Sequence, residues 1–185
     1  MQSREEALAL WREYNTEDSQ FRHALAVEAA MRHFAKEADE DPDYWGLVGL
    51  LHDVDYGKWP EEHLAHAREI LGKAGFPEAF IRAVESHGWG LCSSVEPLLP
   101  MEKVLYAVDE LTGFITACAY VRPSRSVMDL EVKSVKKKWG TAAFAAGVDR
   151  SVIEKGAAML GLGLDDLIGK TIAAMRAEAS ALGLD

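Results

Sequence analysis

The chain has 185 residues, and its 30 acidic and 20 basic side chains give a formal net charge of −10 at neutral pH. Hydrophobic residues make up 49% of it, which is the composition of a globular domain and excludes collagen and extended disorder. Two cysteines are too few for a disulfide framework or a cysteine-based zinc ribbon. The acidic balance argues against a nucleic acid polymer as partner, because such binding needs a basic surface.

The start of the chain does not resemble a targeting segment, because Met1 is followed by the charged stretch 3–6 rather than by a basic and then an apolar region. The sequence also contains no run of about eighteen apolar residues, so we expect no membrane-spanning segment and no membrane partner. These observations predict a cytoplasmic location.

The elements expected along the chain are all helices, because apolar residues recur at spacings of three and four and alternating β-branched runs are absent. Ser3 and Glu6 match a capping box at the start of a first helix that ends near residue 14. A second helix starts at residue 18 or 19 and ends in the acidic stretch 37–43. Further helices are expected at 44–53, opened by Pro42, and at 60–75, 77–87, 101–120, 129–139, 149–160 and 164–182. The pattern predicts an all-α protein whose residues 1–185 form one compact helical bundle.

The histidines are unevenly distributed: all six lie between His23 and His87, and the last 98 residues contain none. His52 and Asp53 end the strongly apolar helix expected at 44–53, so both side chains should face protein rather than water. A buried carboxylate is costly unless it is paired or bound to a cation, so Asp53 needs a partner.

Two other helices offer inward-facing polar groups. His23 precedes Val27, Met31 and Phe34 on one helical face, and Asp109 lies in an apolar helix. Imidazoles and carboxylates without a thiolate suit Mn, Fe, Ni, Co or Zn, and Mg less well because of the nitrogen donors. Considered alone, His23 is also consistent with a hydrogen-bonded histidine of the core. Asp109 alone is consistent with a carboxylate that accepts hydrogen bonds from the end of a neighbouring helix.

In this order, the four residues resemble the H…HD…D signature of the HD superfamily of metal-dependent phosphohydrolases. The signature residues are His23, His52, Asp53 and Asp109. The resemblance covers about residues 18–120 and implies an all-helical fold with a divalent metal at its centre. The helices expected in 121–185 would complete the helical bundle. The family's HD-I-G-K form appears here as His52-Asp53-Val54-Asp55-Tyr56-Gly57-Lys58, with two extra residues before the Gly-Lys pair. That departure leaves the role of Lys58 open, with contact to a substrate phosphate as one candidate.

Members of the superfamily with two metals add two histidines between the HD pair and the last aspartate. We expect His63 and His87 in these positions, brought together by a hairpin of two helices around residues 75–77, with Asp53 bridging the two ions. His66 is the alternative to His63 as a metal ligand. Both histidines are also consistent with ordinary surface residues near the start of a helix.

The segment 122–138 holds six basic and two acidic residues, a local charge of +4. Arg122 and Arg125 follow the helix that carries Asp109, so they are candidates for holding phosphate oxygens. The lysines at 136–138 fit an exposed helix face, and we expect Glu110 to face solvent.

The sequence and the resemblance together predict a phosphohydrolase that uses one or two divalent metals, with His52 and Asp53 at the catalytic centre. The expected substrate is a small phosphorylated molecule, for example a nucleotide. Two alternatives use the same ligands: an HD-type di-iron oxygenase, and a regulatory module that binds metal and ligand without turnover. Self-association into a homo-oligomer is left open.

Overall fold

The computed structural model describes residues 2–185. Within that range it contains ten α-helices and one short 3₁₀ helix, and no strand, so the predicted all-α fold is confirmed. The elements are α1 (Arg4–Tyr14), α2 (Asp18–Glu37), α3 (Pro42–Leu51), η1 (Pro60–Glu62), α4 (Ala67–Lys73), α5 (Glu78–Ser86), α6 (Pro100–Tyr120), α7 (Val132–Trp139), α8 (Arg150–Leu160), α9 (Leu164–Ala177) and α10 (Ala179–Leu182). Among the helices of residues 2–185, none has the length and apolar character needed to cross a bilayer.

Several helix ends follow directly from local sequence. Ser3 and Glu6 form the predicted capping box on α1. Asp41 caps α3, whose first residue is Pro42, a position where proline loses no helical hydrogen bond. Gly161 ends α8 with a φ of 67°, a left-handed conformation that glycine adopts without steric cost.

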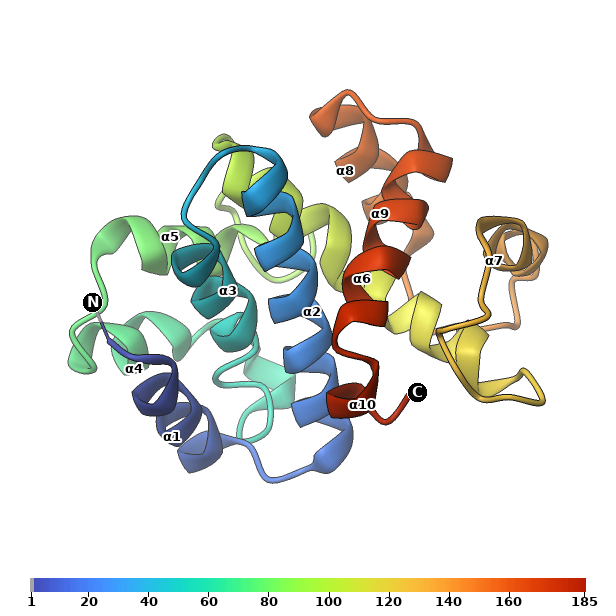
Figure 1. Cartoon of the computed structure of the whole chain (residues 1–185). Helices are drawn as coiled ribbons and strands as arrows, with labels where there is room; N and C mark the ends of the chain where they lie inside the picture. The colour runs from blue at the N-terminus through green and yellow to red at the C-terminus, as the bar shows by residue number, and fades with distance from the viewer. Residues whose placement is uncertain (1) are drawn as a thin grey trace.

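Helix α2 lies at the centre of the molecule and contacts α3, α6, α9 and α10 (Figure 1). The approach of α2 to α3 is close because Gly49 has no side chain: a Cβ there would lie 2.9 Å from the Val27 carbonyl oxygen. A buried apolar cluster continues from this contact into α6 and includes Met31, Leu50 and Leu105. The packing therefore holds α2, the end of α3 and the middle of α6 in fixed relation.

The expected helix at 60–75 is divided in the structure. After η1 the chain turns, and α4 begins only at Ala67. The Asp55 carboxylate accepts hydrogen bonds from the backbone N–H groups of Leu64 and His66, which holds these residues in a turn. Leu64 accordingly has a φ of 69°. The interruption separates His63 from the helix that we expected to carry it.

Two other boundaries differ from the sequence-based expectation. Helix α3 ends at Leu51, so His52 is its C-cap and Asp53 lies just beyond the helix. The expected helix at 164–182 is broken at Glu178, where the chain bends and allows α10 to return against α2. The C-terminal residues are also tied to the segment after α6, because the Val127 N–H donates to the Leu184 carbonyl at 2.8 Å.

Candidate metal centre

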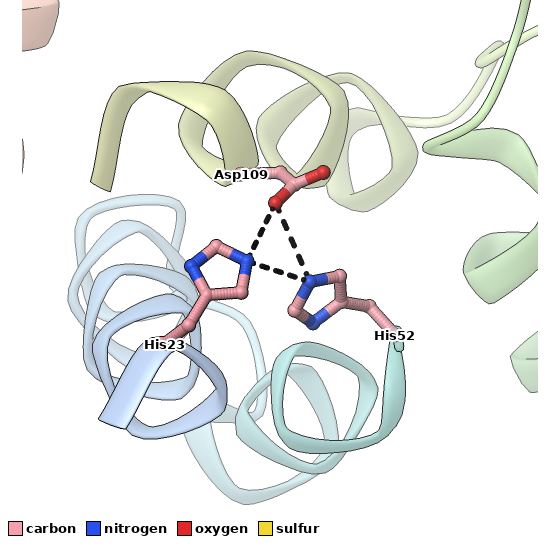
Figure 2. A group of neighbouring side chains, drawn as sticks. All are labelled: His23, His52 and Asp109. Atoms are coloured by element: carbon pink, nitrogen blue, oxygen red, sulfur yellow. Dashed lines mark hydrogen bonds and ion pairs between the residues drawn. The ribbon is translucent and has the colours of Figure 1, made fainter. Parts of the chain in front are cut away.

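Three side chains from separate helices converge at the centre of the bundle (Figure 2). His23 comes from α2, His52 from the end of α3 and Asp109 from α6. The Asp109 Oδ1 atom lies 3.0 Å from His23 Nε2 and 3.3 Å from His52 Nε2, and the two Nε2 atoms are 3.2 Å apart. We call this group the first trio.

A second trio consists of Asp53, His63 and His87. The Asp53 Oδ1 atom lies 3.2 Å from His63 Nε2 and 3.5 Å from His87 Nε2. The other carboxylate oxygen, Oδ2, faces the first trio and lies 3.4 Å from His52 Nε2. Asp53 therefore presents one oxygen to each trio, which is the arrangement of a bridging carboxylate.

The outward-facing nitrogens of two histidines fix their orientation. His52 Nδ1 lies 2.7 Å from the Gly49 carbonyl, and His87 Nδ1 lies 2.7 Å from the Val84 carbonyl. A carbonyl oxygen only accepts, so each Nδ1 carries the proton and donates it. In the neutral imidazole, each Nε2 then has a free lone pair that faces the trios.

The other two histidines are oriented by side chains. His63 Nδ1 lies 3.1 Å from Asp55 Oδ1, and His23 Nδ1 lies 3.4 Å from Thr112 Oγ1. Thr112 already donates its hydroxyl proton to the Asp109 carbonyl, so it accepts from His23. In the neutral form of the rings, all four Nε2 atoms consequently offer a lone pair toward the trios.

This donor set fits divalent cations. Metal bonds of about 2.1 Å place neighbouring donors about 3.0 Å apart at right angles and about 3.4 Å apart in a tetrahedron. The donor separations within the trios, from 3.0 to 3.5 Å, lie in that range. Imidazole and carboxylate ligands suit Mn, Fe, Ni, Co or Zn. The two trios would hold one ion each, with Asp53 shared.

The carboxylates and imidazoles shift one another's protonation strongly. Burial by itself would lower the pKa of His52, but the Asp53 and Asp109 charges outweigh it and raise the pKa well above its ordinary value. Burial would raise the pKa values of Asp53 and Asp109, yet contact with the histidines holds both well below the usual range. The centre thus favours ionised carboxylates, which are the form that binds a cation.

Asp55 is a functional residue that the sequence analysis did not identify. It is fully buried, and its carboxylate accepts from His63 Nδ1 and from the backbone N–H groups of Leu64 and His66. Burial would raise its pKa, but these hydrogen bonds lower it. The available signal is its position two residues after Asp53, in a segment expected to be a loop. Asp55 both orients His63 and shapes the turn that presents it.

A cavity of about 380 Å³ opens over both trios. Its walls include Tyr56, Leu91, Cys92 and Glu110. The expectation that Glu110 faces solvent is therefore wrong: it lines this cavity and accepts from the Asp149 N–H. Burial first, and then the Asp109 charge, raise the pKa of Glu110 to about 7. The residues that line the cavity include no lysine or arginine.

The three proposed phosphate contacts lie elsewhere, which corrects their assignment. The Lys58 ammonium lies 4.8 Å from the centre of the Trp59 ring and is outside the cavity. Arg122 forms an exposed ion pair with Asp129 at 2.8 Å, so its guanidinium is already engaged. Arg125 lies in the exposed turn after α6. All three side chains therefore lie at the surface outside the cavity, a position that the pattern of charges in the sequence did not indicate.

The structure also distinguishes the two candidate histidines of the loop. His63 Nε2 lies 3.1 Å from His87 Nε2, as the hairpin expectation required. His66 instead stacks on Trp59, with ring centres 4.1 Å apart, and contacts the exposed Glu62. Of the two alternatives, His63 is the one that the fold brings into the trios.

Comparison with known proteins gives one match. A family model described as HD domain matches residues 21–113, half of the chain. This range contains all six side chains of the two trios. No curated protein and no solved structure matches the chain.

Proposed function

The chain belongs to the HD domain family, and from this premise we propose that it is a metal-dependent phosphohydrolase acting on a small phosphorylated molecule. One observation carries the proposal: two groups of metal ligands share Asp53 at the base of a single cavity. Paired divalent ions are a common arrangement for in-line displacement at phosphorus.

The ligand roles follow from the geometry. His23, His52 and Asp109 would hold the first ion, and His63 and His87 the second, while Asp53 would contribute one oxygen to each. Divalent ions bound there would supply a nucleophile from water near neutral pH and offset the charge that develops on the phosphoryl oxygens. The protein's own contribution is orientation, because every histidine is fixed by a partner on its Nδ1 atom.

The cavity indicates the size of the substrate. A volume of about 380 Å³ is in the range of small-molecule sites. Tyr56 and Leu91 provide apolar surface at its wall. Because no lysine or arginine lines it, neutralisation of a phosphoryl group there falls to the bound cations. We therefore infer a small phosphate ester rather than a nucleic acid polymer.

The test is elemental analysis of protein purified without chelators, combined with assays of phosphate esters in the presence of Mn, Co, Ni, Zn or Fe. We expect bound divalent metal and phosphate release, both lost in His52→Ala. The matched control is His33→Ala, which removes an imidazole of α2 that contacts Glu37 and the Phe34 ring and does not line the cavity. Metal-free protein, or turnover unchanged in His52→Ala, would refute the proposal.

The same assay distinguishes the two alternative functions. Stoichiometric iron together with oxygen consumption and no phosphate release would identify an oxygenase. Metal and ligand binding without any turnover would identify a regulatory module.

A further inference from the structure

A second cavity adjoins the one above the trios. It has a volume of about 240 Å³ and shares Ser19, His23 and Gly113 with the first cavity. From this shared wall it extends to Tyr120 on α6 and to Leu184 near the C-terminus. We call this cavity the side groove. Any ligand bound at the trios therefore has an adjoining space into which a second part of it can extend.

One face of α6 links the two cavities. Asp109, Gly113, Thr116 and Tyr120 follow one another at spacings of four, three and four, so they lie on the same helical stripe. Asp109 belongs to the first trio, and the other three line the side groove. Eleven helical residues span about 16 Å, so Tyr120 lies well beyond the reach of a phosphoryl group at the metals. The side groove thus fits the part of a substrate that does not react.

The wall of the side groove carries an unpaired cation. Arg22 is the only lysine or arginine that lines either cavity, and its side chain is exposed. Over residues 2–185, no carboxylate forms an ion pair with Arg22, although Asp18 precedes it by one helical turn. By contrast, Arg4 is paired with Glu28. A free guanidinium beside a metal site is available to bind an anionic group of a ligand.

Gly113 lies in the wall that the two cavities share. A glycine inside a helix is less favourable than alanine by about 1 kcal/mol. Close packing does not require it here, because the nearest atom to a Cβ at this position is Val148 Cγ2 at 3.9 Å. This differs from Gly156, where a Cβ would lie 2.6 Å from the Ala107 backbone. A side chain at 113 would instead occupy the shared wall of the two cavities.

We propose that the side groove is the leaving-group subsite of the enzyme, and that Arg22 binds a second anionic group of the substrate there. The apolar or aromatic part of the leaving group packs against Tyr120, the exposed aromatic side chain of the side groove. The substrate class is then a phosphate ester whose leaving group carries both a ring or apolar portion and a further negative charge. This inference rests on the proposed function, which places the phosphoryl group at the trios.

The experiment measures binding of phosphonates, whose C–P bond is not hydrolysed, to the metal-loaded full-length protein by calorimetry. The matched ligands are benzylphosphonate and 4-carboxybenzylphosphonate, which differ by one carboxylate. We expect the carboxylate to tighten binding about tenfold, as a charge-assisted hydrogen bond does. Arg22→Gln should remove this difference, whereas the matched control Lys36→Gln, an exposed cation at the far end of α2, should preserve it.

A second variant tests the shared wall itself. Gly113→Leu favours the helix, so loss of folding is not expected. It should weaken benzylphosphonate about tenfold more than methylphosphonate, because only the former reaches past residue 113. Equal effects on the two ligands would contradict a subsite in the side groove.

The remaining outcomes separate this inference from the proposed function. Equal affinity for the two benzyl ligands, an equal loss of both in Arg22→Gln, or no binding of either overturns the inference. Hydrolysis of phenyl phosphate is measured in parallel. Turnover without Arg22-dependent discrimination refutes only the subsite. Discrimination without turnover refutes the hydrolase and its leaving-group subsite, and leaves Arg22 as a contact for an anionic group of a bound ligand.

Discussion

The candidate metal centre and the basic segment 122–138 are both concentrations of charged side chains, but they differ in burial and in how far apart their residues lie in the sequence. At the centre, side chains from distant parts of the sequence converge, and His52 is fully buried. In the basic segment, Arg122, Lys133 and Lys136 each pair with an exposed acid. Exposed pairs contribute little to stability, whereas buried polar groups demand exact partners. The candidate metal centre is therefore marked by convergence and burial of its side chains rather than by a high local density of charge.

The strongest test of this contrast is removal of the shared carboxylate. Asp53→Ala takes one oxygen from each trio and should lower kcat/KM for a phosphate ester by about 1,000-fold, or about 4 kcal/mol. Asp129→Ala, which removes an acid of the basic segment, should leave kcat/KM within twofold, as expected for an exposed acid. Retention of activity within tenfold in Asp53→Ala would remove the distinction between the two regions.

Asp55→Asn should have the next largest effect. The amide keeps the size of the side chain but loses the charge that orients His63, so metal affinity should fall about 10- to 100-fold. The measurement is metal titration of the chelator-treated protein. Glu62→Gln is the control because the Glu62 carboxylate contacts His66, which lies outside the trios. An affinity for metal equal to that of the wild type would show that Asp55 only shapes the turn.

Asp53 and Asp55 illustrate which parts of the site could be predicted from the sequence and which could not. The order of histidines and aspartates in the sequence pointed to His23, His52, Asp53 and Asp109 as ligands. The helical period and the apolar neighbours of these residues indicated that their side chains point inward. The contact of Asp55 with His63 could not be predicted, because it depends on a turn that interrupts the helix expected at 60–75.

The fold and the phosphate contacts show the same difference: the sequence was enough to predict the fold class, but not the residues near the cavity that bear positive charge. The all-α class and most helix limits follow from local spacing and from caps such as Ser3 and Asp41. The assignment of Lys58, Arg122 and Arg125 failed because the direction of a long surface side chain is set by tertiary neighbours, such as Asp129, that sequence spacing does not identify. Arg22 adjoins His23 in the sequence, yet only the side groove distinguishes it from other surface cations.

A smaller effect is expected from pH in the metal-free protein. Burial lowers the pKa of His63, but hydrogen bonds to Asp53 and Asp55 outweigh this and raise it to about 9. Because the folded-state value exceeds the unfolded one, the stabilisation is complete below about pH 6.5 and is lost as pH rises through about 9. The free energy of unfolding should fall by roughly 1 to 2 kcal/mol, since neighbouring groups share the protons.

Chemical denaturation at pH 6.5 and pH 9 measures this change. His63→Gln should reduce the dependence, and His66→Gln should keep it because that ring lies outside the trios. A dependence that is the same in wild type and His63→Gln would show that His63 is not its source.

The smallest effect should come from the basic segment. Arg122→Gln breaks the exposed pair with Asp129 and should leave the free energy of unfolding almost unchanged, because solvent screens such a pair. KM for phosphate esters should stay within twofold of the wild type. A large rise in KM would restore Arg122 as a phosphate contact and contradict its placement outside the cavity.

The central claim is that the two trios form one centre in which Asp53 serves two ions. Metal titration of the chelator-treated protein, with elemental analysis of the product, tests it most directly. We expect two divalent ions per chain in the wild type, and one in His63→Ala because the first trio remains intact. No bound metal, or the same stoichiometry in both proteins, would contradict it.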